Sequence, residues 1–259
     1  MNSDRYGARM ITIGSSDAFN HGGRANSSFW VEDSLGSYLL DCGPTTTMSL
    51  QKLSSSQQLE LRSLDVIYLT HLHGDHIGGL PVLLLELCFG QGRKHPLLIA
   101  GPVGAESRVR ALCECSYSGM IESMLPFDLI FKEWPLRGEG VYGQRTVKSV
   151  PAQHDPQSSP TSIRISDDHH SIAFSGDTGW SDELRELSSG VDAFVIECSY
   201  KDAVFAGHLS LEEIESQREQ LTPKKLILTH FSDDSREAAQ ESSKRLDLHV
   251  ADDGVQWKL

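Results

Sequence analysis

Four side chains able to bind a metal ion fall within six residues, in the segment His71-Leu72-His73-Gly74-Asp75-His76. The segment directly follows an apolar run over residues 66–69, which predicts a buried strand. Loops that leave such strands are where α/β proteins place their chemistry. Three imidazoles and a carboxylate favour zinc, with iron or manganese as alternatives. A polar loop with scattered histidines does not account for this density beside a strand.

Three further candidates follow predicted strands later in the chain. His154 comes after residues 147–150, and Asp177 and His230 come after apolar runs that end at residues 175 and 228. A strand end places a side chain on the rim of a sheet, where several strands converge on one site. Taken alone, His154 is an ordinary loop histidine and Asp177 is a good turn or helix-capping residue.

The elements that must position these residues alternate between strands and helices. Strands are predicted over residues 10–13, 28–32, 37–41, 66–69, 97–100, 146–150, 162–165, 171–175, 193–196 and 225–228. Helices are predicted over residues 77–88, from residue 105 onward, and over residues 211–220 and 235–246. This alternation in both halves predicts two sheets covered by outer helices. No repeat or linker divides the chain, so we expect a single domain over residues 1–259.

Composition narrows the classes of partner. The formal net charge of −13 repels phosphate backbones, so long nucleic acid is a poor partner, whereas a bound metal ion could offset the charge of a small substrate. Five scattered cysteines argue against a disulfide framework and predict a reducing, cytoplasmic location. The first residues, including Asp4, Arg5 and Arg9, contain no secretory signal, and no apolar run is long enough to span a membrane.

The metal-binding candidates, taken in order, resemble the metallo-β-lactamase superfamily over nearly the whole chain. Asp41-Cys42-Gly43 is also similar to a turn that precedes the metal motif in many members. The resemblance implies an α/β fold, the four-layer αβ/βα sandwich, with a two-metal site at one edge. It implies two Zn²⁺ ions, with Mn²⁺ or iron as alternatives, because the ligands are nitrogen and oxygen only. Carried over residue by residue, one ion takes His71, His73 and His154, the other takes Asp75, His76 and His230, and Asp177 bridges the two.

Within the superfamily the chain looks most like the ribonuclease Z branch and its phosphodiesterase relatives. Residues 206–210 resemble a Gly-His-Ser segment whose histidine is catalytic, here His208. Residues 194–197 resemble a strand ending in a glutamate that orients this histidine, here Glu197. The branch also implies that Asp75 doubles as a base for the attacking water. The chain lacks the long arm that clamps transfer RNA, because only 23 positions separate His154 from Asp177.

These features predict a dinuclear metal-dependent hydrolase. The leading hypothesis is a phosphodiesterase in which a metal-bridging hydroxide attacks a small-molecule or short oligonucleotide substrate and His208 supports the leaving oxygen. Hydrolysis of a lactone, lactam or thioester at the same site is the alternative, and a non-catalytic metal-binding protein is an alternative of another class. The Glu197 and His208 pair favours phosphorus. Structured RNA and membranes are not expected partners, and the branch implies that a homodimer is plausible.

Overall fold

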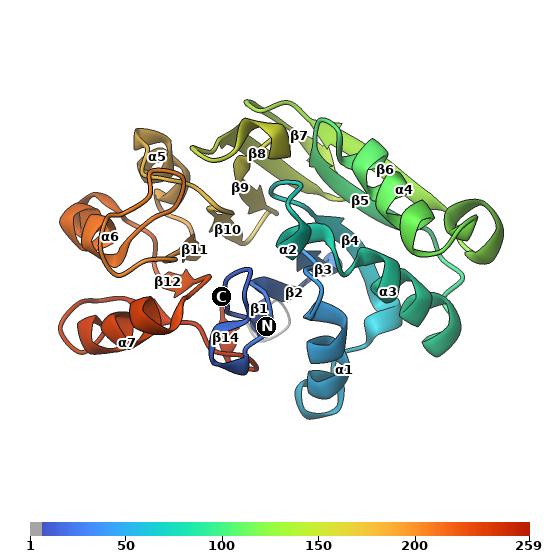
Figure 1. The fold of residues 1–259 in the computed structure, drawn as a ribbon, viewed down its shortest axis with the longest axis horizontal. Helices are drawn as coiled ribbons and strands as arrows, with labels where there is room; N and C mark the ends of the chain where they lie inside the picture. Colours follow the sequence, from blue (N-terminus) through green and yellow to red (C-terminus); the bar gives the residue numbers. More distant parts are fainter. Residues whose placement is uncertain (1–6) are drawn as a thin grey trace.

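The computed structural model describes residues 7–259, in which two sheets pack face to face and helices cover their outer surfaces (Figure 1). The first-half elements are β1 (Arg9–Gly14), β2 (Ser28–Asp33), β3 (Gly36–Leu40), α1 (Thr46–Gln57), β4 (Leu64–Tyr68), α2 (Gly74–Ile77), α3 (Leu80–Leu85), β5 (Leu97–Pro102), α4 (Ala105–Ser116) and β6 (Leu129–Trp134). The second-half elements are β7 (Gly138–Tyr142), β8 (Arg145–Pro151), β9 (Thr161–Ser166), β10 (Ser171–Phe174), α5 (Asp182–Ser188), β11 (Ala193–Glu197), α6 (Leu211–Gln217), β12 (Leu226–Thr229), α7 (Asp233–Ser242), β13 (His249–Val250) and β14 (Gln256–Lys258). Asp4 and Arg5, on which the absence of a secretory signal was predicted, lie outside the described residues.

The strands form two sheets of similar size. The first has the order β14-β1-β2-β3-β4-β5-β6, and the second has the order β13-β12-β11-β10-β9-β8-β7. The last strand, β14, therefore belongs to the first sheet, where it pairs with β1, although it follows the strands of the second sheet in sequence.

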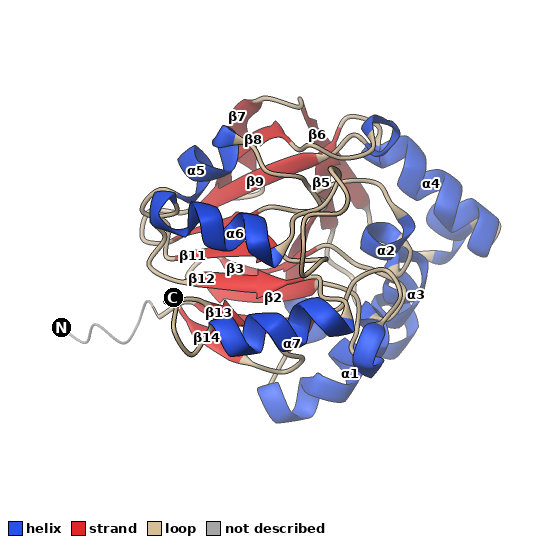
Figure 2. Cartoon of the chain, turned by 60° about the vertical axis from the view of Figure 1, so that its left-hand side comes forward, coloured by secondary structure: helices blue, strands red, loops and turns tan. Residues whose placement is uncertain are grey.

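Alternating side chains of the strands create three apolar layers. In β1, Ile11 packs with the helices of the first half, whereas Met10 packs between the sheets. The rings of Phe29 and Phe174 meet in that middle layer, with their centroids 5.8 Å apart. A third layer lies under α5, α6 and α7, which Figure 1 shows on the side of the strands opposite to α1, α3 and α4. Figure 2 shows α6 and α7 in front of the strands that they cover. The predicted four-layer αβ/βα sandwich is confirmed.

Strand direction brings many loops to one rim. β3, β4, β5 and β6 are mutually parallel, and so are β10, β11, β12 and β13. The carboxyl ends of parallel strands share one edge of a sheet, which is where α/β folds place their sites. His71 follows β4 and His230 follows β12, so both lie on this rim.

The helix predicted over residues 77–88 begins later than expected, at Leu80, and its helical turns continue to Gly90. α2 ends at Ile77 and α3 begins at Leu80. Gly79 lies against the backbone of Gly43, where an added Cβ would be only 2.0 Å from the Gly43 carbonyl oxygen. The interruption lets the loop after β4 pack closely on the turn after β3.

Two other features bear on the sequence predictions. All five cysteines are free thiols, and four of them are buried. Among the described residues, no helix combines the length and the apolar character needed to cross a bilayer.

Candidate metal centre

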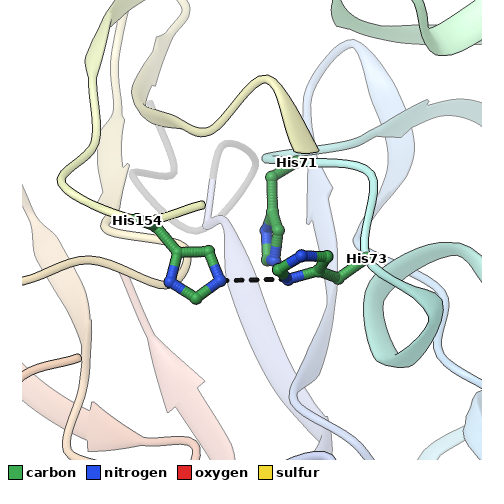
Figure 3. A group of neighbouring side chains, drawn as sticks. All are labelled: His71, His73 and His154. Atoms are coloured by element: carbon green, nitrogen blue, oxygen red, sulfur yellow. Dashed lines mark hydrogen bonds between the residues drawn. The ribbon is translucent and has the colours of Figure 1, made fainter. Parts of the chain in front are cut away.

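The structure brings all seven predicted metal ligands together at the rim. They form two groups in which the potential ligand atoms lie within 4.8 Å of one another: His71, His73 and His154 in one, and Asp75, His76, Asp177 and His230 in the other. Figure 3 shows the first group, in which His73 Nδ1 and His154 Nε2 approach to 3.0 Å. Asp177 faces both groups, because one of its oxygens is 3.7 Å from His71 Nε2 and the other is 3.2 Å from His76 Nε2.

Each of the five imidazoles uses its second ring nitrogen for a hydrogen bond away from this cluster. The partner atoms are Asp41 Oδ2 for His76 (2.7 Å), Gly207 O for His154 (2.8 Å), Ser199 Oγ for His230 (2.9 Å), Thr70 Oγ1 for His71 (3.1 Å) and Asp155 Oδ2 for His73 (3.2 Å). A carbonyl or carboxylate oxygen only accepts, so it keeps a proton on the nitrogen that it faces. The other ring nitrogen then offers its lone pair to the cluster, as in metal sites of known proteins.

Three atoms at the centre lack a hydrogen-bond partner although they are buried. They are His71 Nε2, His76 Nε2 and Asp177 Oδ1. A buried polar atom without a partner costs free energy, and an ion bound between these atoms would remove that cost. Because the donors are imidazole nitrogens and carboxylate oxygens, the residues fit a divalent metal ion such as zinc.

The buried carboxylates and imidazoles of the cluster stabilise one another's charged forms. Burial opposes ionisation of Asp177, yet His230, His76 and His71 hold the pKa of its carboxyl well below the usual range. Burial also opposes the imidazolium form of His230, but Asp177 and Asp75 raise its pKa to about 9. The pKa of His76 is raised for the same reason, against its burial. In the metal-free protein, protons on these histidines therefore take the role of the ions.

Left-handed backbone occurs at two of the residues that organise the cluster. Asp41 follows β3 with φ of 54°, and His230 follows β12 with φ of 59°. Residues other than glycine seldom adopt this conformation and keep it only where their surroundings enforce it. At Asp41 those surroundings include Thr70, whose N–H and hydroxyl both donate to the carboxylate at 2.8 Å.

Glu197 and His208 form a pair beside the cluster, as the sequence predicts. His208 Nδ1 lies 3.0 Å from Glu197 Oε1, which also accepts the N–H of Thr178 at 2.6 Å. Burial lowers the pKa of His208, but the Glu197 carboxylate more than offsets this and raises it. A capping box between Ser210 and Glu213 begins α6 just beyond this histidine and fixes the backbone there.

Sequence reasoning misses or underestimates three residues that contact the predicted ligands. Asp41 was considered only as a turn residue, and Thr70 and Ser199 were not considered at all. Each stands just past the end of a strand, and each contacts a predicted ligand through its side chain. A polar residue at a strand end next to a known ligand or acid is the signal that could have identified them.

Comparison with known proteins assigns the chain to a family. Residues 8–250 match the family described as Anti-Pycsar protein Apyc1. The chain belongs to the Anti-Pycsar protein Apyc1 family. The matched residues of this Apyc1-family chain contain the whole candidate metal centre together with Glu197 and His208.

The sequence relatives of the Apyc1-family chain include ribonucleases Z. It is 28% identical over 249 residues to the mitochondrial ribonuclease Z of Drosophila melanogaster, a match covering 89% of this chain and 32% of the relative. It is 23% identical over 274 residues to the ribonuclease Z of Ignicoccus hospitalis, covering 87% of this chain and 88% of the relative. The chain spans about a third of the length of the first curated relatives that it matches.

Solved structures share the fold of the Apyc1-family chain. The metallo-beta-lactamase fold protein YhfI from Bacillus subtilis has a TM-score of 0.77 at 20% identity, covering 98% of this chain and 100% of YhfI. The short form of human tRNase Z has a TM-score of 0.76 at 23% identity, covering 96% and 98%. A diphosphatase from the PhnP family has a TM-score of 0.73 at 18% identity, covering 97% and 98%. The predicted membership in the metallo-β-lactamase superfamily, as a ribonuclease Z-like protein, is confirmed.

Proposed function

We propose that this chain is a dinuclear metal-dependent phosphodiesterase that acts on a small or short phosphodiester. The observation that carries the proposal is a shared carboxylate, Asp177, between two ligand groups, with a carboxylate-backed histidine beside them. The His208 ring centroid is 4.7 Å from that of His154 and 5.8 Å from that of His230. Relatives named ribonuclease and diphosphatase support chemistry at phosphorus rather than at a carbonyl carbon.

The ligand assignment follows the two groups of side chains. His71, His73 and His154 would hold one ion, Asp75, His76 and His230 would hold the other, and Asp177 would contact both. We propose Zn²⁺ at both positions, with Mn²⁺ or iron as alternatives, since no thiolate takes part. When bound, such ions lower the pKa of water toward neutrality and offset the charge on phosphoryl oxygens.

His208 is proposed as the acid that serves the leaving oxygen. Glu197 accepts a hydrogen bond from the Nδ1–H of His208 and thereby fixes the ring, which leaves Nε2 to carry the proton that is passed on. Against the effect of burial, the Glu197 carboxylate raises the pKa of His208, which favours the protonated ring. A positioned acid of this kind contributes about 10²- to 10⁴-fold in rate.

Asp75 is proposed to accept the proton of the attacking water. Burial opposes its ionisation, but His76 and His230 hold the pKa of its carboxyl well below the usual range. Its Oδ2 is 3.2 Å from His76 Nε2 and 3.4 Å from His230 Nε2, inside the second ligand group. The carboxylate therefore remains ionised, as its role as a ligand requires.

The proposed substrate is a small molecule or a short oligonucleotide rather than structured RNA. Only the short hairpin of β9 and β10 separates His154 from Asp177, so no long arm is available there to hold a large RNA. The net charge of −13 supports the same conclusion. The five free thiols support the proposed reducing, cytoplasmic location.

A substrate panel tests the proposal. Protein loaded with zinc or manganese is assayed on bis-aryl phosphates, cyclic nucleotides, dinucleotides, a lactone, a thioester and nitrocefin. We expect turnover of phosphodiesters, with Asp177→Ala losing metal from both positions and activity with it. Carbonyl turnover without phosphodiester turnover would favour the lactone, lactam or thioester alternative. Full metal occupancy with no turnover of any ester would favour a non-catalytic metal-binding protein.

We also propose that two copies of the chain associate through α1, α3 and the helical turn over Glu86–Gly90. Met48, Val82 and Phe89 are 65%, 48% and 72% exposed and line one shallow groove. Exposed apolar side chains gathered in this way are typical of interaction surfaces. Sedimentation velocity should detect a dimer that Phe89→Ser weakens, and a monomer at all accessible concentrations would contradict this part of the proposal.

We propose that residues 1–259 act as one folding unit. The pairing of β14 with β1 supports this, because it joins the end of the second half to the first sheet. A single unfolding transition that is the same by circular dichroism and tryptophan fluorescence is the expected result. Two separate transitions would contradict it.

A further inference from the structure

One hydroxyl, that of Ser199, lies between the metal ligands and the Glu197–His208 pair. Its Oγ donates to Glu197 Oε2, lies 2.9 Å from His230 Nδ1 and lies 3.4 Å from His208 Nδ1. The residue is buried and follows β11 directly after Cys198. A single side chain therefore touches a proposed ligand, a proposed acid and the carboxylate that orients the acid.

Hydrogen-bond polarity determines the direction of each contact. The Glu197 carboxylate only accepts, so the proton of the Ser199 hydroxyl points toward it. The Ser199 oxygen can then only accept from His230, which places a proton on His230 Nδ1. The remaining nitrogen, His230 Nε2, lies 3.4 Å from both Asp75 Oδ2 and Asp177 Oδ1. The serine thus selects the imidazole form that presents a lone pair to the metal centre.

The same arrangement occurs independently in the first half of the chain. Thr70 Oγ1 donates to Asp41 Oδ2 at 2.8 Å and lies 3.1 Å from His71 Nδ1. Again a buried carboxylate orients a hydroxyl, and the hydroxyl orients a ligand histidine. This recurrence in unrelated sequence argues that the hydroxyl has a positioning role and is more than a filler of space.

We propose that Ser199 is a positioning residue that couples the ligand His230 to the acid His208 through Glu197, an inference that rests on the proposed phosphodiesterase function. Ser199 contacts no substrate in this scheme. Its hydroxyl holds His230 in the metal-binding form and supplies one of the hydrogen bonds that fix Glu197 behind His208. Removing it should therefore disturb metal binding and acid catalysis together.

The test compares Ser199→Ala, which removes the hydroxyl, with Ser199→Thr, which keeps it. Zinc affinity is measured by competition with a chromophoric chelator, and the proton on the His230 ring nitrogens is followed by ¹⁵N NMR of the zinc-bound protein. Ser199→Ala should bind one of the two ions about 10- to 100-fold more weakly, the usual effect of removing a group behind a ligand. At saturating zinc its kcat for substrates with poor leaving groups should fall about tenfold with little change in KM. Ser199→Thr should restore both properties.

Ser37→Ala is the matched control. Ser37 is also buried and donates its hydroxyl proton to a backbone carbonyl, that of Ser63 at 3.0 Å, but it stands at the start of β3, away from the rim. Its loss should leave zinc affinity, the NMR signals and kcat unchanged. Equal effects of the two alanine variants would overturn the positioning role, because they would point to general packing.

Two further outcomes separate this inference from the proposed function. Wild-type zinc affinity and wild-type ring signals in Ser199→Ala would overturn it whatever the substrate is. If the unaltered protein hydrolyses no phosphodiester, the proposed function fails, while the affinity and NMR measurements still decide the role of Ser199. Should Ser199→Ala not fold, Ser199→Cys keeps the volume with a weaker donor and should show a smaller loss in the same direction.

Discussion

In the first half of the molecule, a buried carboxylate orients two histidines that both belong to the ligand set. Asp41 accepts from His76 Nδ1 at 2.7 Å and from the Thr70 hydroxyl, which in turn contacts His71. Both imidazoles are almost completely buried and aim their Nε2 atoms inward, where neither has a hydrogen-bond partner. We propose that this network serves metal binding alone.

In the second half, Glu197 has the place of Asp41, Ser199 that of Thr70, and His230 that of His71. The two networks differ in their second imidazole. His208, the counterpart of His76, has an 18% exposed side chain, whereas the side chain of His76 is 1% exposed. In our proposal, one arrangement of carboxylate, hydroxyl and two imidazoles thus gives two ligands in one half, and one ligand plus one solvent-accessible acid in the other. Accessibility, more than hydrogen bonding, distinguishes the two roles.

The strongest test replaces His208, and separately the proposed ligands His76 and His73, with alanine. His208→Ala should retain both ions and lose about 10²- to 10⁴-fold in kcat, with a smaller loss for substrates whose leaving groups need no proton. His76→Ala and His73→Ala should lose metal and activity together. Metal content by elemental analysis and kcat on a leaving-group series measure the difference. Loss of an ion from His208→Ala would show that the two halves do not differ in the way we describe.

Metal removal tests how the raised pKa values of His230 and His76 affect stability. The pKa of His230 is raised to about 9, above its unfolded value near 6.5, so its stabilising contribution is complete below pH 6.5 and is lost as the pH rises through 9. The metal-free protein should therefore lose of the order of 2–3 kcal/mol of unfolding free energy over that range. His76, whose pKa is also raised, acts in the same direction. Urea unfolding measures this loss, which the zinc-loaded protein should not show.

Asp41→Asn addresses the first network directly. Both carboxylate oxygens of Asp41 accept, one from the Thr70 N–H and the other from the Thr70 hydroxyl and His76. The asparagine amide has only one acceptor oxygen, so at least one of these hydrogen bonds is lost. Zinc affinity should fall about 10- to 100-fold, and turnover should recover when zinc is saturating. Chelator competition and zinc titration of kcat give the two measurements. A kcat defect that persists at saturating zinc would contradict a role confined to metal binding.

Glu197→Gln should give the smallest effect. Unlike Asp41→Asn, it should lower kcat more than it lowers the affinity for zinc. The amide oxygen can still accept from His208, so the ring remains oriented but loses the negative charge that raises its pKa. We expect about a tenfold fall in kcat on poor leaving groups, with the affinity for zinc less affected than in Asp41→Asn. Equal zinc affinities in the two variants would remove the distinction between the networks.

The ligand residues were predictable because they combine a dense motif with positions at strand ends. The contacts of the Thr70 and Ser199 hydroxyls were harder to predict. Asp41 and Thr70 are distant in the sequence and meet only because β3 and β4 are adjacent and parallel. Glu197 and Ser199 are two positions apart at the end of β11, where side chains share a face, so this contact was within reach of sequence reasoning.

Two elements of the first half show why the rest of the fold was incompletely predicted. α1 is rich in serine and threonine, and Leu50 is the one apolar residue that it buries, so neither helix propensity nor an apolar stripe indicates it. β6 is the edge strand of the first sheet and exposes much of its length, so it lacks the apolar run of a central strand. The hydrophobic pattern identifies strands that are buried on both faces better than those at the edges.

The pairing of β14 with β1 also fixes the order in which the molecule can assemble. During synthesis the His71–His76 motif leaves the ribosome well before His230, and the strand that joins the two halves emerges last. The nascent chain therefore passes through a stage in which half of the ligand set is present without its counterpart. Because contacts so distant in sequence form late in folding, we expect the proposed ions to join a scaffold that is already built and not to nucleate it, unlike the ion of a zinc finger.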